Sequence, residues 1–144
     1  MRALLDVNVL IALLDGSHLH HRATTKWLAG QARSGWASCP VTQNGCIRLL
    51  SLPAYPSPQP PAAIAERLAA ATNDRSHAFW PDQISLLEPS LISWNHVLGA
   101  RHITDVYLLA LAVANRGCLV TFDRSISLAA VAGAQARHLV VLGA

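Results

Sequence analysis

The sequence is poor in charge and especially poor in acids. Charged residues make up 13% of the 144 positions, and only eight residues are acidic, two of them glutamates. Lys26 is the single lysine, so the formal net charge of +3 is carried by arginines. Hydrophobic residues reach 52%, which indicates extensive burial or a protein partner that covers part of the surface. The mild basic excess permits an anionic partner such as nucleic acid.

Long hydrophobic runs are missing as well. The longest, VYLLALAVA at 106–114, falls short of the ~18 to 20 residues that a bilayer-spanning helix needs. The apolar N-terminal stretch carries Asp6 and Asn8 in its middle and has no convincing cleavage site, which argues against a signal peptide. We therefore expect a soluble, cytoplasmic protein with no membrane segment.

Cysteine is sparse and irregularly placed. Cys39, Cys46 and Cys118 are odd in number, lie in apolar surroundings and form no CxxC pair. This pattern argues against a disulfide framework and against a cysteine-based zinc site. The histidines His18 and His21 lack a third ligand at a suitable spacing, so zinc is not indicated by them either.

The length fits one domain over residues 1–144, large enough to fold around a single core. Short apolar strand-like runs alternate with helical patterns, which favours βα units and a parallel sheet. Strands are predicted at 2–5, 36–39, 83–88, 118–122 and 138–142. Helices are predicted at 8–14, 18–32, 43–52, 62–72 and 105–115, with a short one at 90–98.

Single residues mark some of the expected boundaries. Thr42 and Thr104 are the expected N-caps of the helices at 43–52 and 105–115, and Gly117 is the expected C′ residue of the second of these. The proline-rich segment 53–61 is expected to be a surface loop.

Three of the acids follow or precede predicted strands in a regular way. Asp6 comes directly after the first strand and Asp123 directly after 118–122, at the edge of a parallel sheet where ligands bind. Asp105 opens a helix that leads into 118–122 and runs antiparallel to that strand, so it reaches the same edge. Gln43, in the first turn of the helix after 36–39, is expected there by the same geometry.

This convergence predicts a metal site. Each acid has an ordinary explanation when taken alone: Asp105 in a first helical turn and Asp123 in a turn are both common. A buried, unpaired Asp6 would be costly, however. Three clustered carboxylates repel one another and call for a cation. Oxygen ligands suit Mg²⁺ or Mn²⁺, which activate water and neutralise charge on a phosphoryl group.

The chain resembles the PIN-domain ribonucleases, and among them the VapC-type toxins of bacterial toxin–antitoxin pairs. The resemblance spans nearly the whole chain and is carried by DVNVLIALLD, by PVTQNGCIRLL, by TDVYLLALAVANRGCLVTFDRSI and by the last strand. It implies a three-layer α/β/α sandwich with a central parallel sheet. It also implies that Asp6, Asp105 and Asp123 form the metal site, that Asn8 supports Asp6, and that Thr121 helps to order the site.

The same resemblance implies a function and partners. The reaction is hydrolysis of RNA phosphodiester bonds by water that a Mg²⁺ ion held by Asp6 and Asp105 activates, and Arg48 and Arg124 are the expected phosphate contacts. Many relatives carry Glu where this chain has Gln43, which leaves open whether one metal or two bind. A homodimer and a VapB-type antitoxin that covers the site are implied, and the proline-rich loop with its flanking helices is the candidate antitoxin groove.

Two other functions stay open at this point. A haloacid-dehalogenase-like phosphohydrolase also carries an Asp after its first strand, but it normally has a DxD pattern and a later lysine; here the second position is Asn8 and Lys26 comes too early. A catalytically decayed PIN domain that only binds RNA or protein is the second alternative, since Gln43 brings no charge.

Overall fold

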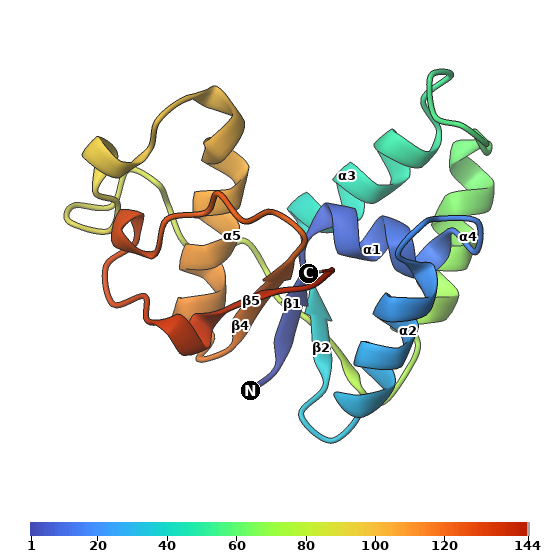
Figure 1. Cartoon of the computed structure of the whole chain (residues 1–144), viewed down its shortest axis with the longest axis horizontal. Helices are drawn as coiled ribbons and strands as arrows, with labels where there is room; N and C mark the ends of the chain where they lie inside the picture. Colours follow the sequence, from blue (N-terminus) through green and yellow to red (C-terminus); the bar gives the residue numbers. More distant parts are fainter. Residues whose placement is uncertain (144) are drawn as a thin grey trace.

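The computed structural model describes residues 1–143 and has a five-stranded sheet at its centre. All strands are parallel, in the order β3-β2-β1-β4-β5 (Figure 1). The strands are β1 (Ala3–Leu5), β2 (Trp36–Ser38), β3 (His77–Phe79), β4 (Cys118–Thr121) and β5 (Leu139–Val141). The predicted parallel α/β class is confirmed.

Helices cover both faces of this sheet, as Figure 1 shows. One face is covered by α1 (Val7–Leu14), α2 (His21–Gly30), α3 (Pro40–Leu50) and α4 (Pro61–Thr72), and the other by α5 (Ile103–Ala114). Short 3₁₀ turns accompany α5 on its side. The architecture is therefore the expected three-layer α/β/α sandwich. Within residues 1–143 no helix combines the length and the apolar character that a membrane span requires.

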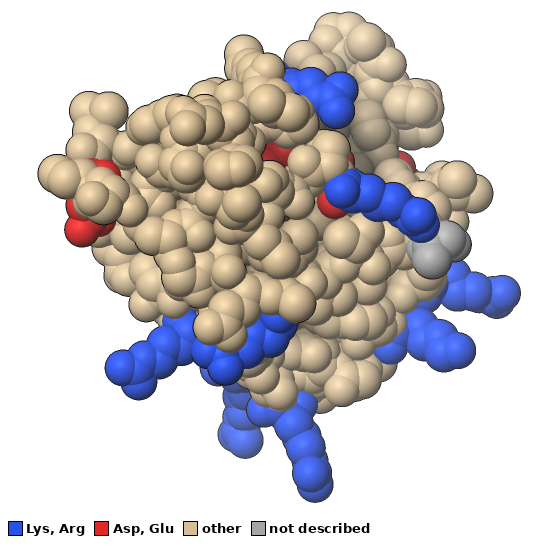
Figure 2. All heavy atoms as spheres, turned by 60° about the vertical axis from the view of Figure 1, so that its left-hand side comes forward, with Lys and Arg blue, Asp and Glu red and all other residues tan. Residues whose placement is uncertain are grey.

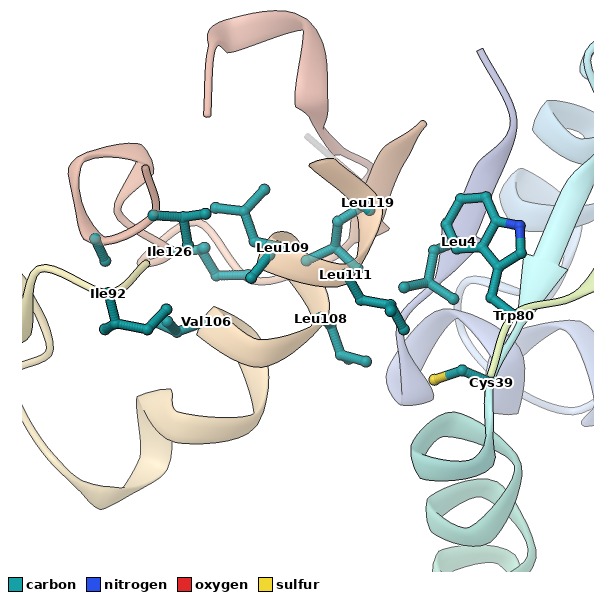
Figure 3. Packing of buried hydrophobic residues seen from close by; sticks show 14 of the residues in the cluster. Leu4, Cys39, Trp80, Ile92, Val106, Leu108, Leu109, Leu111, Leu119 and Ile126 are labelled. Atoms are coloured by element: carbon teal, nitrogen blue, oxygen red, sulfur yellow. The ribbon is translucent and has the colours of Figure 1, made fainter. Parts of the chain in front are cut away.

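The three inner strands β1, β2 and β4 are short, almost continuous apolar runs because they are buried on both faces. In β1, Leu4 packs toward α5, whereas Ala3 and Leu5 belong to the core on the α1 side. In β4, Leu119 packs toward α5 in the same way. Figure 3 shows Leu4 and Leu119 beside leucines of α5 in this core. The alternation along each strand thus divides the molecule into two cores with the sheet between them.

The predicted third strand was wrong. Residues 83–88 form loop and turn, and the third strand is β3, six residues earlier. Ile84 and Leu86 pack against the α5-side core without joining the sheet, which explains their apolar pattern. β3 is an edge strand that is only partly buried, so its sequence HAF carries a weak strand signal. The short helix expected at 90–98 is limited to a 3₁₀ turn at Trp94–His96.

Several predicted helix ends were also wrong. α3 begins at Pro40 with Cys39 as N-cap, and Thr42 is its third residue: the Thr42 hydroxyl oxygen accepts a hydrogen bond from the Cys39 amide at 3.0 Å. Proline is favoured in this first position because it has no amide hydrogen to satisfy. α2 begins only at His21, which leaves Leu19 in the preceding loop and 88% exposed rather than on the buried face.

α5 also differs from its prediction at both ends. It begins at Ile103 after His102, so Thr104 lies within the first turn and does not cap it. The left-handed residue after the helix is Arg116, with φ 57°, and not Gly117. Gly117 has a different role, because a Cβ there would lie 2.4 Å from the carbonyl oxygen of Arg2. The glycine lets the start of β4 approach β1.

Candidate active site

The candidate site lies at the switch point of the sheet. From β1 at the centre, the chain goes to β2 and β3 on one side and then crosses to β4 and β5 on the other. In open parallel sheets ligands bind at the carboxyl ends of the strands where this reversal occurs. Asp6 follows β1 there, Asp123 follows β4, and Asp105 arrives on the first turn of α5. The structure thus brings the three predicted acids to one edge.

Asp6 is held firmly and is 5% exposed. It is the N-cap of α1, and its Oδ1 accepts a hydrogen bond from the Val7 amide at 2.7 Å. Its Oδ2 accepts one from the Thr121 hydroxyl, also at 2.7 Å. Burial raises the pKa of Asp6, while these two hydrogen bonds stabilise the anion and oppose the rise. The two hydrogen bonds therefore fix the direction of the carboxylate, while no positively charged side chain among residues 1–143 contributes to its pKa.

Thr121, fully buried at the end of β4, connects two of the acids. Its hydroxyl donates to Asp6 and accepts from the Asp123 amide at 3.0 Å. Asp123 in turn accepts from the hydroxyl and the amide of Ser125 at 2.6 and 2.8 Å. These bonds lower the pKa of Asp123, which keeps it ionised.

The surroundings of Asp105 disfavour its ionised form. Burial, followed by the nearby charges of Asp6 and Asp123, raises its pKa to about 6. Arg101 opposes this rise with its positive charge. At neutral pH the edge therefore carries a concentration of negative charge that a bound cation would relieve.

A cleft of about 420 Å³ opens beside these acids, between α1, α3 and the start of α5. Its polar lining consists of Asp6, Asn8, Asn44, Arg48, Thr104 and Asp105. The Oδ1 atom of Asn8 is buried and has no hydrogen-bond partner, and an orphaned acceptor of this kind usually marks a missing water or ion. Figure 2 shows acidic atoms recessed in this face with basic side chains projecting around them.

The residues present fit a hydrated divalent cation. Among residues 1–143, no three His, Cys, Asp or Glu side chains lie close enough together to coordinate a metal ion by themselves. Mg²⁺ does not require one, because it keeps several of its waters and is usually bound by one or two carboxylates. Asp6 and Asp105 supply such carboxylates on the wall of the cleft, and Asn8 lines the same wall.

The structure does not bring Gln43 to the acids. The Gln43 amide nitrogen donates to the Ser38 hydroxyl at 2.9 Å, and that hydroxyl pairs with Nε2 of His77 at 2.8 Å. Because α3 begins at Pro40, Gln43 is its fourth residue and not in its first positions, and Asn44 and Gly45 line the cleft in its place. Arg48 lines the cleft, whereas Arg124 is exposed and lies outside its lining.

Asn44, Thr104 and Arg101 were not predicted from the sequence as site residues. Asn44 could have been found: with Pro40 as the first helical residue, Val41, Asn44 and Arg48 follow the spacing i, i+3, i+7 that places residues on one helix face. Arg101 lies in the 3₁₀ turn Ala100–His102 before α5, and its bond to His102 depends on how that turn folds. No pattern in the sequence indicates it.

The chain matches the family model of the PIN domain over residues 3–133, and it belongs to the PIN-domain family. It is 51% identical to Ribonuclease VapC44 of Mycobacterium tuberculosis, over 99% of this chain and the whole of that protein. It is 43% identical to Ribonuclease VapC39 of the same organism, over 92% of this chain and 96% of the relative. Ribonuclease VapC29 is 38% identical over 88% of this chain. The resemblance to VapC-type PIN proteins is confirmed, whereas the single-domain extent over residues 1–144 stays a prediction.

Proposed function

We propose that the protein is a metal-dependent endoribonuclease and the toxin of a toxin–antitoxin pair. The observation that carries this proposal is the placement of Asp6, Asp105 and Asp123 at the switch point, beside a cleft with an unsatisfied Asn8 oxygen. RNA as the substrate is supported by the similarity to proteins named ribonucleases. A cleft with Arg48 on its wall suits a polyanionic substrate.

Asp6 and Asp105 are the proposed metal ligands, with Asp123 completing the site directly or through water. A bound Mg²⁺ or Mn²⁺ would supply an activated water and neutralise charge on the phosphoryl group. Thr121 and the Val7 amide fix the direction of the Asp6 carboxylate, so little reorganisation is needed on binding. Asn8 lines the cleft beside Asp6 and supports the site there, and Arg48 offers donors to phosphate oxygens.

A VapB-type antitoxin and a homodimer are further parts of this proposal. The name VapC of the relatives supports the toxin assignment. Exposed apolar side chains near the start of α5, Trp94, Leu98 and Ile103, offer a surface for a protein partner. The proline-rich loop stays a candidate as well, and it is fixed against the end of α1 by a hydrogen bond from the Tyr55 hydroxyl to Asp15.

The two alternatives gain no support from the site. Lys26, the lysine that a haloacid-dehalogenase mechanism would need, lies on α2 beside Ala23 and Trp27 and not on the cleft. The decayed-enzyme reading depended on Gln43, which lies outside the cleft, so its lack of charge does not count against catalysis.

An RNA cleavage assay tests the proposal. Purified protein is incubated with single-stranded RNA in the presence of Mg²⁺, of Mn²⁺ or of a chelator, beside an Asp105→Asn variant. We expect cleavage only with the divalent ion and its loss in the variant. Cleavage that persists in the chelator, or an Asp105→Asn variant as active as the parent, would contradict the mechanism. Hydrolysis of small phosphate esters without RNA cleavage would support a phosphohydrolase.

A further inference from the structure

A second, smaller hollow shares Asp105 with the cleft. It measures about 40 Å³, and its polar lining is His96, His102, Asp105, Ser125 and Ser127. A single water needs roughly 10–15 Å³ of such space, so the hollow can take one or two waters or phosphate oxygens but not a nucleobase. Asp105 belongs to both the hollow and the cleft. The polar surface therefore continues past the proposed metal site toward the loop before α5.

An RNA strand that crosses this surface meets three carboxylates and needs cations on either side of them. On the α3 side, Arg48 lines the cleft. On the α5 side, Arg101 is hydrogen-bonded to His102, whose side chain lines the small hollow together with Asp105.

The guanidinium of Arg101 is also oriented. Its Nε donates to Nε2 of His102 at 3.3 Å, and His102 lines the small hollow together with Asp105. This bond uses the Nε donor, so the two terminal amino groups of Arg101 are available as a fork for phosphate oxygens. Arg101 is exposed, which leaves those groups open to a ligand from solvent.

We propose that Arg101, oriented by His102, binds the RNA phosphate that lies on the α5 side of the scissile bond, with the small hollow receiving one of its oxygens. The inference rests on the proposed function and assigns to Arg101 the phosphate contact expected of Arg124. Arg101 is a substrate-binding residue in this account, and His102 is a positioning residue that acts through it.

Binding to RNA in a cleavage-deficient background tests this inference separately from catalysis. Full-length protein carrying Asp6→Asn is titrated into fluorescein-labelled single-stranded RNA, alone and with Arg101→Ala or Arg22→Ala. Arg22 is exposed on α2 and is the matched control for the loss of one positive charge. We expect Arg101→Ala to weaken binding about five- to tenfold. The slope of log K against log salt should become shallower by about 0.7. If Arg101→Ala weakens RNA binding no more than Arg22→Ala does, the inference is overturned.

The positioning role of His102 has its own comparison. His102→Gln keeps an acceptor at the place of Nε2 and should bind RNA like the parent, whereas His102→Ala should lose part of the affinity that Arg101→Ala loses. Equal binding by all three His102 forms would contradict the positioning role. If the wild-type protein does not cleave RNA but Arg101→Ala still weakens binding, the proposed function fails and the phosphate contact stands. If the wild type cleaves RNA and Arg101→Ala binds it normally, the proposed function stands and the phosphate contact fails.

Discussion

The buried hydroxyl of Thr121 donates a 2.7 Å hydrogen bond to the carboxylate of Asp6, 115 positions earlier in the sequence. The same hydroxyl accepts from the Asp123 amide. Thr121 connects the carboxyl ends of β1 and β4. These two parallel strands are neighbours at the switch point, where the order of the strands in the sheet reverses. One side chain thus holds two of the three acids in position.

Replacement of Thr121 by valine should therefore damage both stability and activity. Thr121→Val leaves an oxygen of Asp6 and the Asp123 amide without partners, at a cost of about 1–3 kcal/mol in the free energy of unfolding. Loss of the orienting bond should lower kcat about tenfold or more. Thr121→Ser keeps the hydroxyl and is the control. Urea unfolding and RNA cleavage measure the two effects, and a valine variant equal to the serine variant would rule out the role of the hydroxyl.

Asp105 should make the stability of the metal-free protein depend on pH. Its pKa is about 6 in the folded state and 3.8 ordinarily, so between these values the folded protein holds a proton that the unfolded chain does not. The destabilisation that ionised Asp105 causes at pH 8 is relieved as pH falls through 6 toward 4. Asp105→Asn lacks this destabilisation at every pH.

The comparison of the two proteins isolates this effect. His77 and His138, whose pKa values are lowered mainly by burial, weaken the fold as pH falls below about 6.5, but they do so in both proteins. The stability advantage of Asp105→Asn over the wild type should be largest at pH 8 and shrink toward pH 4. Denaturant unfolding at several pH values in the presence of a chelator measures it. An advantage that is constant or grows toward low pH would be inconsistent with the raised pKa.

Gln43 and Asn44 should respond in opposite ways to removal. Gln43→Ala takes away a hydrogen bond to Ser38 and should cost about 0.5–1.5 kcal/mol of stability, with RNA cleavage close to the wild-type rate. Asn44→Ala changes the cleft wall and should raise KM with little change in stability. Steady-state cleavage and urea unfolding separate the two. If Gln43→Ala is folded but loses RNA cleavage, Gln43 is part of the active site and the prediction is wrong.

Gly45 should tolerate no side chain. A Cβ at Gly45 would lie 2.8 Å from Cγ2 of Val7, the residue after Asp6, so alanine forces α3 away from α1. We expect Gly45→Ala to lose about 1–3 kcal/mol and to cleave RNA poorly. Gly30→Ala is the control, because no atom lies within 4 Å of its Cβ position. Equal urea midpoints for the two variants would show that the close approach of α1 and α3 is unimportant.

The edge of the sheet that carries the site could be predicted from the sequence, because it depends only on where strands end and helices begin. Asp6 and Asp123 follow apolar strands, and Asp105 opens the helix before β4. The predicted strand at 83–88 failed because Ile84 and Leu86 are partly buried outside the sheet, and burial gives the same apolar signal with or without strand pairing.

The lining of the cleft was harder to predict, since it depends on helix rotation and loop conformation. Gln43 and Asn44 are neighbours on α3 but point about 100° apart, so only one of them can face the cleft, and the residue that does so is Asn44. The orientation of Arg101 by His102 depends on the 3₁₀ turn before α5, which no periodic pattern marks.

The most direct test of the central claim is RNA cleavage by Asp6→Asn at saturating Mg²⁺ or Mn²⁺, measured beside the wild type. Asparagine keeps one oxygen, which can accept from Thr121 but not also from the Val7 amide, and it removes the charge of a carboxylate whose pKa burial raises. The relief of the buried charge opposes the loss of one hydrogen bond, so the variant should remain folded. We predict that it loses metal-dependent cleavage by several orders of magnitude while still binding RNA. A folded Asp6→Asn variant that cleaves RNA at the wild-type rate would contradict the account.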